Sequence, residues 1–262
     1  MMNAPIGLGP LCPSKYARPN LRQSAFTMTP FVLDTPCLML HEPRLRSNAS
    51  RMCARAQSLG VALRPHLKTT KSDRIARIAV GPGPLLGTVA TVREAEYFVA
   101  HGHTDLIYAV CVTPDKLDRV AALNQQATTV TVITDQLEIA RTIARHPGRH
   151  SVMVEIDCGE HRTGLDPTNP EVIAIGKTIR AAPRATFRGV LTHGGHSYQC
   201  EDIHQIIHVA EQERAAAAHA AQALRQARQA QRDAAVAAAH AAWEAERQDP
   251  TGGVRGRGAG PV

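Results

Sequence analysis

The sequence lacks several features that mark particular classes of protein. Aromatic residues make up 3% of its 262 residues, and no apolar run approaches the ~20 residues that span a bilayer. The six cysteines are scattered and form no Cys-x-x-Cys pair, which excludes a disulfide scaffold and a zinc ribbon. The first residues, up to Gln23, contain no apolar segment of a secretory signal. We therefore expect a cytoplasmic protein with no membrane partner.

Clusters of positive charge are also missing. The net charge of +7 is spread along the chain, without Lys/Arg runs or interleaved aromatic side chains that could stack on bases. A nucleic-acid partner is therefore not expected. With 44% apolar and 20% charged residues, the composition is typical of a folded globular protein, and the length suffices to bury a sizeable core.

A regular alternation of strand and helix patterns runs from about residue 35 to 195. Several of the strands are β-branched almost throughout, as expected where both faces of a sheet are covered. The alternation predicts an α/β fold with a parallel sheet, either doubly wound or a barrel. Strands are predicted at 35–41, 61–67, 84–90, 105–110, 128–134, 151–157 and 187–195, and helices at 43–59, from 72, and at 92–102, 114–126, 135–146 and 170–182.

Polar and charged residues follow three of these strands directly, at Lys68, at 157–162 and at 193–198. In a barrel all three groups would meet at the carboxyl-terminal rim, where barrel active sites lie. A doubly wound sheet would disperse them unless they bracketed its switch point. The sequence therefore favours a TIM-type (β/α)8 barrel.

The first of these groups centres on Lys68, at the end of the strand predicted over 61–67. A lysine on a rigid element beside other cations can form a Schiff base, and Arg64, His66 and Lys71 could supply the positive field. The alternative is a surface lysine in a basic turn.

The other two groups contain acid–base and anion-binding side chains. Arg162, in the stretch 155–164, has a planar guanidinium group that suits a carboxylate or an oxyanion. The alternative is an ordinary βα loop with a salt bridge. His193 and Tyr198 flank paired glycines and could transfer protons, and the alternative there is a hydrogen-bonded turn. No metal site is predicted, because no third ligand accompanies the histidines.

The character of the chain changes after residue 200. Half of the residues from Ala210 to Ala245, 18 of 36, are alanine, so this stretch is predicted to be helical on propensity alone. It offers almost no apolar stripe for docking. We expect three regions, which are a loose arm over 1–30, a partial barrel over 31–225, and an alanine-rich helix with a Gly/Arg tail over 226–262.

Taken together, the motifs resemble one family of enzymes. PHLKT at 65–69, EIDCGEHRTG at 155–164 and GVLTHGGHSY at 189–198 occur in the order and spacing of the D-serine dehydratase and D-threonine aldolase family. TPCLML at 35–40 and TVREAE at 91–96 are also similar to that family. Its members are pyridoxal phosphate enzymes related to the N-terminal barrel of alanine racemase, and the resemblance covers residues 30 to about 225.

The resemblance implies a site and a reaction. Lys68 matches the lysine that forms a Schiff base with pyridoxal 5'-phosphate, and Arg162 matches an arginine near the phenolic oxygen of the cofactor. His193 matches a residue beside the cofactor, and His66 and Tyr198 are assigned to the cofactor site with it. The expected activity is that of a lyase on D-amino acids with a β-hydroxyl group, with Lys68 and His193 as catalytic residues. Which D-amino acid is used stays open, and a homodimer is possible.

The chain departs from the family pattern after about residue 225. The cofactor-phosphate loop, the last barrel strands and the C-terminal β-domain with its metal pair have no counterpart, so the ligands of a divalent metal such as zinc are expected to be absent. We expect about six barrel strands, in a chain truncated or frame-shifted after 225, and therefore poor folding or inactivity in isolation. An amino-acid racemase, a non-catalytic cofactor-binding homeostasis protein and an interaction role for the alanine-rich helix are the alternatives.

Overall fold

The structure is a computed structural model that describes residues 34–125 and 127–248. The chain divides into two units, Met1–Leu40 and His41–Val262, and only 34–40 of the first are described. The predicted arm over 1–30 and the tail from 249 lie outside the described residues. The strand predicted over 35–41 is wrong, because 34–40 form no strand and Leu38 is 99% exposed. An apolar segment becomes a strand only where its backbone groups are paired.

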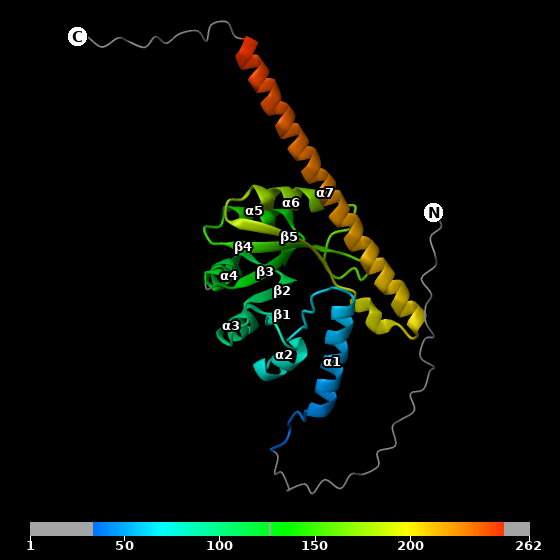
Figure 1. Ribbon diagram of the computed structural model, residues 1–262. Coiled ribbons are helices and arrows are strands. Elements are labelled where there is room, and N and C mark those ends of the chain that lie inside the picture. The colour runs from blue at the N-terminus through cyan, green and yellow to red at the C-terminus, as the bar shows by residue number, and fades with distance from the viewer. Residues whose placement is uncertain (1–33, 126, 249–262) are drawn as a thin grey trace, which may run out of the picture. The chain divides into compact units, whose positions relative to one another are not determined.

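Five strands form one sheet in the order β1-β2-β3-β4-β5, and every neighbouring pair is parallel (Figure 1). A helical segment follows each of the first four strands, which is the connection that parallel neighbours require. This arrangement agrees with the predicted barrel, of which it forms a contiguous part. The strands are β1 (Leu86–Val89), β2 (Asp105–Cys111), β3 (Thr129–Thr134), β4 (His150–Ile156) and β5 (Ala185–Thr192).

The helices begin and end close to their predicted limits. Thr91 caps one of them, α3, by accepting a hydrogen bond from the Glu94 backbone N–H, while the Glu94 carboxylate accepts one from Ala90. This reciprocal pairing satisfies two donors at the helix start. The helices are α1 (Glu42–Ser58), α2 (Asp73–Val80), α3 (Val92–Ala100), α4 (Leu117–Asn124), α5 (Leu137–Arg145), α6 (Glu171–Ala181) and α7 (Ile203–Gln248), with short 3-10 turns η1 (Pro114–Lys116) and η2 (Gly195–Gln199).

The strand predicted over 61–67 is reduced to a single parallel bridge between His66 and Thr88. Two backbone hydrogen bonds, from Leu67 to Thr88 and from Thr88 to Pro65, attach it to β1. Proline has no N–H to donate, so the ladder cannot continue through Pro65. The described residues therefore form five strands, with this bridge in place of the sixth barrel strand that was expected.

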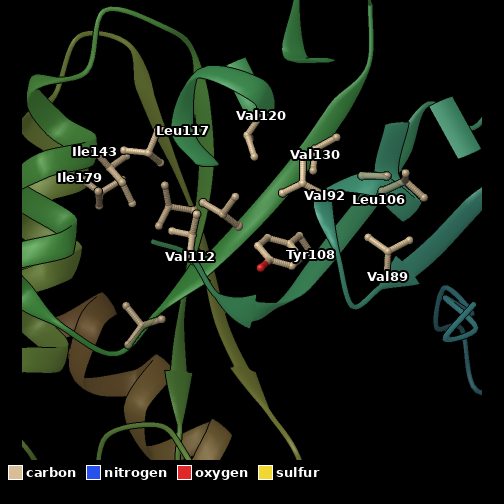
Figure 2. Packing of buried hydrophobic residues seen from close by; sticks show 14 of the residues in the cluster. Val89, Val92, Leu106, Tyr108, Val112, Leu117, Val120, Val130, Ile143 and Ile179 are labelled. Carbon is tan, nitrogen blue, oxygen red and sulfur yellow. The ribbon is translucent and has the colours of Figure 1, made fainter. Parts of the chain in front are cut away.

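The core lies between the sheet and the helices. Residues of β3 and β4, including Val130, Val132, Val152 and Val154, are fully buried in one cluster with helical side chains such as Ile143. Figure 2 shows this packing around Tyr108, Val112 and Leu117. Each such side chain contributes about 1.5–3 kcal/mol when fully buried, and this layer holds the strand ends in place.

The helix predicted over 210–245 is part of the longer α7. Its first half packs on the rest of the domain, because Val209, Ala220 and Leu224 are buried and α7 contacts α6 and β5. From 225 to 244 none of its side chains is buried, as the missing apolar stripe predicted. Figure 1 shows this second half extending past the sheet.

Candidate active site

The carboxyl ends of the strands bring the predicted site residues to one edge of the sheet. Lys68 lies just beyond the bridge to β1, Arg162 in the loop after β4, and His193 directly after β5. Lys68 is exposed, and its ammonium forms no hydrogen bond or ion pair with any residue that the structure describes. Its amine is therefore open to a ligand.

His66 lies in the same neighbourhood as Lys68. The Lys68 backbone N–H donates to His66 Nδ1 at 3.4 Å. Burial lowers the pKa of His66, and the positive charge of Lys68 lowers it further, with a smaller contribution from His193. The neutral form of His66 is therefore favoured.

The positive field expected around Lys68 is only partly present. Arg64 forms an ion pair with Asp105 at 2.6 Å, and Lys71 forms one with Glu94 at 3.4 Å. Both cations are therefore engaged by carboxylates. His66 is the one of the three proposed neighbours without such a partner in the described part of the chain.

The loop after β4 is held in one shape by Asp157. One oxygen of its carboxylate accepts hydrogen bonds from the backbone N–H groups of Gly159 (2.9 Å) and His161 (3.0 Å), and the other lies 2.6 Å from His161 Nδ1. Burial raises the pKa of Asp157, but these hydrogen bonds outweigh it and the net shift is downward. Gly164 has φ +96°, and a Cβ there would lie 2.6 Å from the Asp157 nitrogen, so only glycine closes the loop.

Arg162, His193 and Glu160 form a triangle at this edge. His193 Nδ1 lies 2.6 Å from Glu160 Oε2, and Arg162 Nη1 lies 3.5 Å from His193 Nε2 and 3.9 Å from Glu160 Oε1. Burial raises the pKa of Glu160, but the hydrogen bond with His193 and the charges of His193 and Arg162 produce a net lowering. Sequence reasoning missed Glu160, whose signal was an acid two residues before Arg162 in the same loop.

A second polar cluster lies beside this triangle, at the ends of β2, β3 and β4. The Cys111 thiol lies 3.3 Å from Asp135 Oδ1 and 3.2 Å from Glu155 Oε2. The remaining oxygens accept hydrogen bonds from the Gly164 N–H and the Thr163 hydroxyl, both at 3.0 Å. The cluster therefore ties the loop that carries Arg162 to three strands.

The donor atoms of Cys111, Asp135 and Glu155 all lie within 4.8 Å of one another, and they are of types that bind zinc. No metal ligands were predicted in this chain, so this grouping was missed. Burial and the neighbouring carboxylates raise the pKa of the Cys111 thiol, whereas a metal requires the thiolate. The thiol and the two carboxylates are hydrogen bonded to one another and to the loop after β4, and we derive no step through a metal.

Two other sequence motifs lie apart from the triangle. The Tyr198 side chain is 90% exposed and forms no hydrogen bond with the described residues, so its place in the cofactor site stays a prediction. His103 and Asp105 bind different partners, Asp73 and Arg64.

Comparison with known proteins gives a consistent result. Residues 40–251 match the model of the family described as "Alanine racemase, N-terminal domain". The chain is 36% identical to a D-threo-3-hydroxyaspartate dehydratase of Delftia sp., 29% to a D-serine dehydratase of Dictyostelium discoideum, and 33% to a 3-hydroxy-D-aspartate aldolase of Paracoccus denitrificans. These alignments cover 87%, 69% and 62% of this chain and 61%, 50% and 43% of the relatives. The chain thus spans about half the length of the curated relatives it matches.

The fold agrees with the sequence match. The solved structure of the Delftia dehydratase superimposes with a TM-score of 0.71 at 37% identity, over 74% of this chain and 52% of that one. No helix among the described residues is long and apolar enough to cross a membrane.

Proposed function

Because the chain belongs to the alanine racemase N-terminal domain family, we propose that it is a pyridoxal phosphate-dependent lyase acting on D-amino acids that carry a β-hydroxyl group. The observation that carries this proposal is the free amine of Lys68 at the same sheet edge as the Glu160–His193–Arg162 triangle. The substrate class is taken from relatives whose names specify 3-hydroxyaspartate or serine of D configuration.

The side chains at this edge fit the cofactor. Lys68 offers an amine without a hydrogen-bonding partner among the described residues, as attack on an aldehyde requires. Arg162 is half-exposed and presents a planar cation that suits an anionic oxygen, and His66 favours its neutral form beside them. When bound, the cofactor supplies an electron sink that stabilises negative charge at the α-carbon of the substrate.

Each side chain then has a defined task. The Lys68 amine would hold the cofactor, and its Nζ would be the atom that carries a proton at this edge. Arg162 holds an anionic oxygen of the cofactor, and His193 lies between Arg162 and Glu160, where it can accept a proton. Tyr198 is left out of this assignment because it forms no hydrogen bond with these residues.

Two alternatives use the same cofactor, and an analysis of the products distinguishes them from a lyase. A racemase would return the α-proton to the opposite face, and a non-catalytic cofactor carrier would leave every amino acid unchanged. The relatives named above are dehydratases and an aldolase, which favours the lyase.

The test is a product assay with the full chain, pyridoxal phosphate, and each of D-serine, D-threonine and D-threo-3-hydroxyaspartate, with and without zinc. A lyase forms ammonia and a keto acid, or glycine and an aldehyde, from at least one D substrate and from none of the L enantiomers. Their formation would support the proposed function and would overturn the expectation that the chain is inactive in isolation. Conversion of D-serine to L-serine without lyase products would establish the racemase. Cofactor binding with every substrate unchanged would establish the carrier.

A further inference from the structure

His196 has two buried ring nitrogens without a hydrogen-bonding partner among the described residues. An imidazole carries at least one N–H donor, and in its neutral form it also carries one acceptor. A buried polar atom that leaves water and finds no partner costs free energy. Two other histidines of this edge are paired, His193 with Glu160 and His161 with Asp157. His196 therefore keeps an unpaired donor beside the proposed site.

The ring of His196 lies near the loop after β4. A Cβ added at Gly159 would be 3.8 Å from His196 Nε2 and 4.0 Å from Oε1 of Gln212 on α7. Gln212 is exposed and forms no hydrogen bond with a described residue, so it does not pair with the ring. The neighbours of the ring in this position therefore supply no hydrogen bond. A partner has to come from a ligand, in a different position of His196.

The turn η2, which carries this histidine, is anchored at its first residue, Gly195. The Gly195 N–H donates to His193 Nδ1 at 3.1 Å and to Glu160 Oε2 at 3.3 Å. A Cβ at position 195 would fall on Glu160 Oε1 and on His193 Cε1. At Gly194 a Cβ would lie 2.8 Å from Glu213 Oε2. Only glycine allows this close approach, so the start of η2 is fixed between two carboxylates.

Beyond Gly195 the turn forms hydrogen bonds only within its own segment. The Ser197 N–H donates to the Gly194 carbonyl at 3.1 Å. The side chains of residues 197–199 form no hydrogen bond with any described residue, and Tyr198 is 90% exposed. A segment with a fixed glycine at one end and few bonds beyond it can turn about that glycine as a unit.

We propose that η2 is a strap that turns about Gly195 and brings the His196 ring to an oxyanion of the bound ligand. An oxyanion accepts the hydrogen bond that His196 lacks in the ligand-free position, so the strap gains this bond only when it closes. The ligand shifts the strap because it binds the closed position better than the open one. The strap is therefore open in the free chain and closed in the complex.

The oxyanion is the carboxylate of the substrate or the phosphate of the cofactor, so this inference rests on the proposed function. Two cations of the edge, Lys68 and Arg162, have tasks at the aldehyde and at one anionic oxygen of the cofactor. Arg64 and Lys71 are ion-paired with carboxylates. A second oxyanion of the ligand therefore needs another donor, and the free N–H of His196 supplies it.

Thermal unfolding of the ligand-free chain tests the unpaired state of His196. Leucine removes the buried polar atoms, so we expect the Tm of His196→Leu to lie about 2–8 °C above that of the wild type. His196→Phe keeps a ring and should raise Tm as well. Exposed His204→Leu on α7 is the matched control and should stay within about 1 °C. An unchanged or lower Tm in both His196 variants would show that the ring is already paired, for instance by water, and would overturn the proposal.

Hydrogen exchange of the full chain tests the closure. With pyridoxal phosphate and D-alanine, we expect the peptide that contains residues 195–199 to exchange at least about threefold more slowly than in the free chain, and His196→Leu to abolish the difference. D-alaninol, in which an alcohol replaces the carboxylate, is the matched ligand. Slowing by pyridoxal phosphate alone assigns the oxyanion to the phosphate, and slowing by D-alanine but not by D-alaninol assigns it to the carboxylate. Slowing that needs either amine, to an equal extent, would overturn the oxyanion.

The strap and the proposed function fail in different ways. If borohydride fixes the cofactor on Lys68 while residues 195–199 exchange at the rate of the free chain with every ligand, the strap is overturned and the proposed function stays intact. A chain that takes up no cofactor, but in which inorganic phosphate slows the same peptide through His196, would do the reverse.

Discussion

At the amino edge of the sheet, His103 and Asp105 are held by fixed partners, Asp73 for the histidine and Arg64 for the aspartate. At the carboxyl edge, Lys68 has no hydrogen bond or ion pair with a described residue, and the His193 side chain is 35% exposed. The same residue types occur at both edges. Their pairing and burial, rather than their identity, separate a structural role from a chemical one.

The amino edge also carries a cavity. A cavity of about 570 Å³ lies at the amino ends of the strands, lined by Arg149, Arg184 and His150 among others. Barrel enzymes place their chemistry at the opposite face, because the loops that carry it follow the carboxyl ends of the strands. The comparison predicts that substitution of Lys68 alters chemistry, whereas substitution of His103 or His150 at the amino edge alters stability.

The largest effect is expected for Lys68→Ala. Removing the amine should reduce turnover at least about 1,000-fold, because no other described group at this edge can replace a covalent nucleophile. The side chain is exposed, so the free energy of unfolding should change by less than about 0.5 kcal/mol. Initial rates and denaturant unfolding measure the two quantities, with exposed Lys177→Ala on α6 as the control. A large loss of stability in Lys68→Ala would contradict the claim that Lys68 has a chemical and not a structural role.

His103→Ala is the corresponding change at the amino edge. His103 is fully buried, packs edge-on against Phe98, and bonds to Asp73. Its removal leaves a cavity and an aspartate without this partner, which should lower the free energy of unfolding by about 2–4 kcal/mol. Cofactor affinity should stay within about twofold of the His204→Ala control, which changes an exposed histidine. Loss of cofactor binding in a folded His103→Ala chain would contradict the division of roles.

The amino edge should also dominate the stability of the protein in mild acid. Burial lowers the pKa of His150 to about 4, with a further contribution from the charge of His146. Between the unfolded value of about 6.5 and this folded value, the unfolded chain binds the proton more readily, so stability falls as pH decreases. The loss from this residue should reach roughly 3 kcal/mol by pH 4. The free energy of unfolding should change less between pH 7 and pH 4 in His150→Phe than in the wild type. An identical pH dependence in the two proteins would refute the assignment of this loss to His150.

A smaller effect is expected at the Cys111 cluster, where the carboxyl edge contributes to stability. Cys111→Val removes the donor between Asp135 and Glu155, and about 1–2 kcal/mol of stability should be lost because the two carboxylates then face each other without it. Cys111→Ser keeps a donor and should lose less than about 1 kcal/mol. Thermal unfolding measures both variants. Equal stability of the valine and serine variants would show that the thiol proton has no role.

The sheet could be predicted from the sequence because its signal is local. The β-branched runs of β3 and β4 appear within single stretches of sequence, and the parallel order places their carboxyl ends at one edge. The positions of Lys68, Arg162 and His193 follow from that rule alone.

The contacts within the site could not be predicted in the same way. Cys111, Asp135 and Glu155 come from three strands, and their approach depends on the register between those strands. The absence of a strand over 61–67 reflects Pro65, whose missing N–H overrides an apolar pattern. Glu160 reaches His193 only because the loop after β4 folds back on Asp157.

Reduction of the full chain with borohydride in the presence of pyridoxal phosphate, followed by mass analysis of the peptides, tests the central claim most directly. The cofactor should be fixed on the peptide that contains Lys68, and the same treatment of Lys68→Ala should leave that peptide unmodified. Equal labelling of Lys68 and of exposed lysines such as Lys177, or labelling that persists in a different peptide of Lys68→Ala at the same level, would contradict the assignment of the carboxyl edge as the cofactor site.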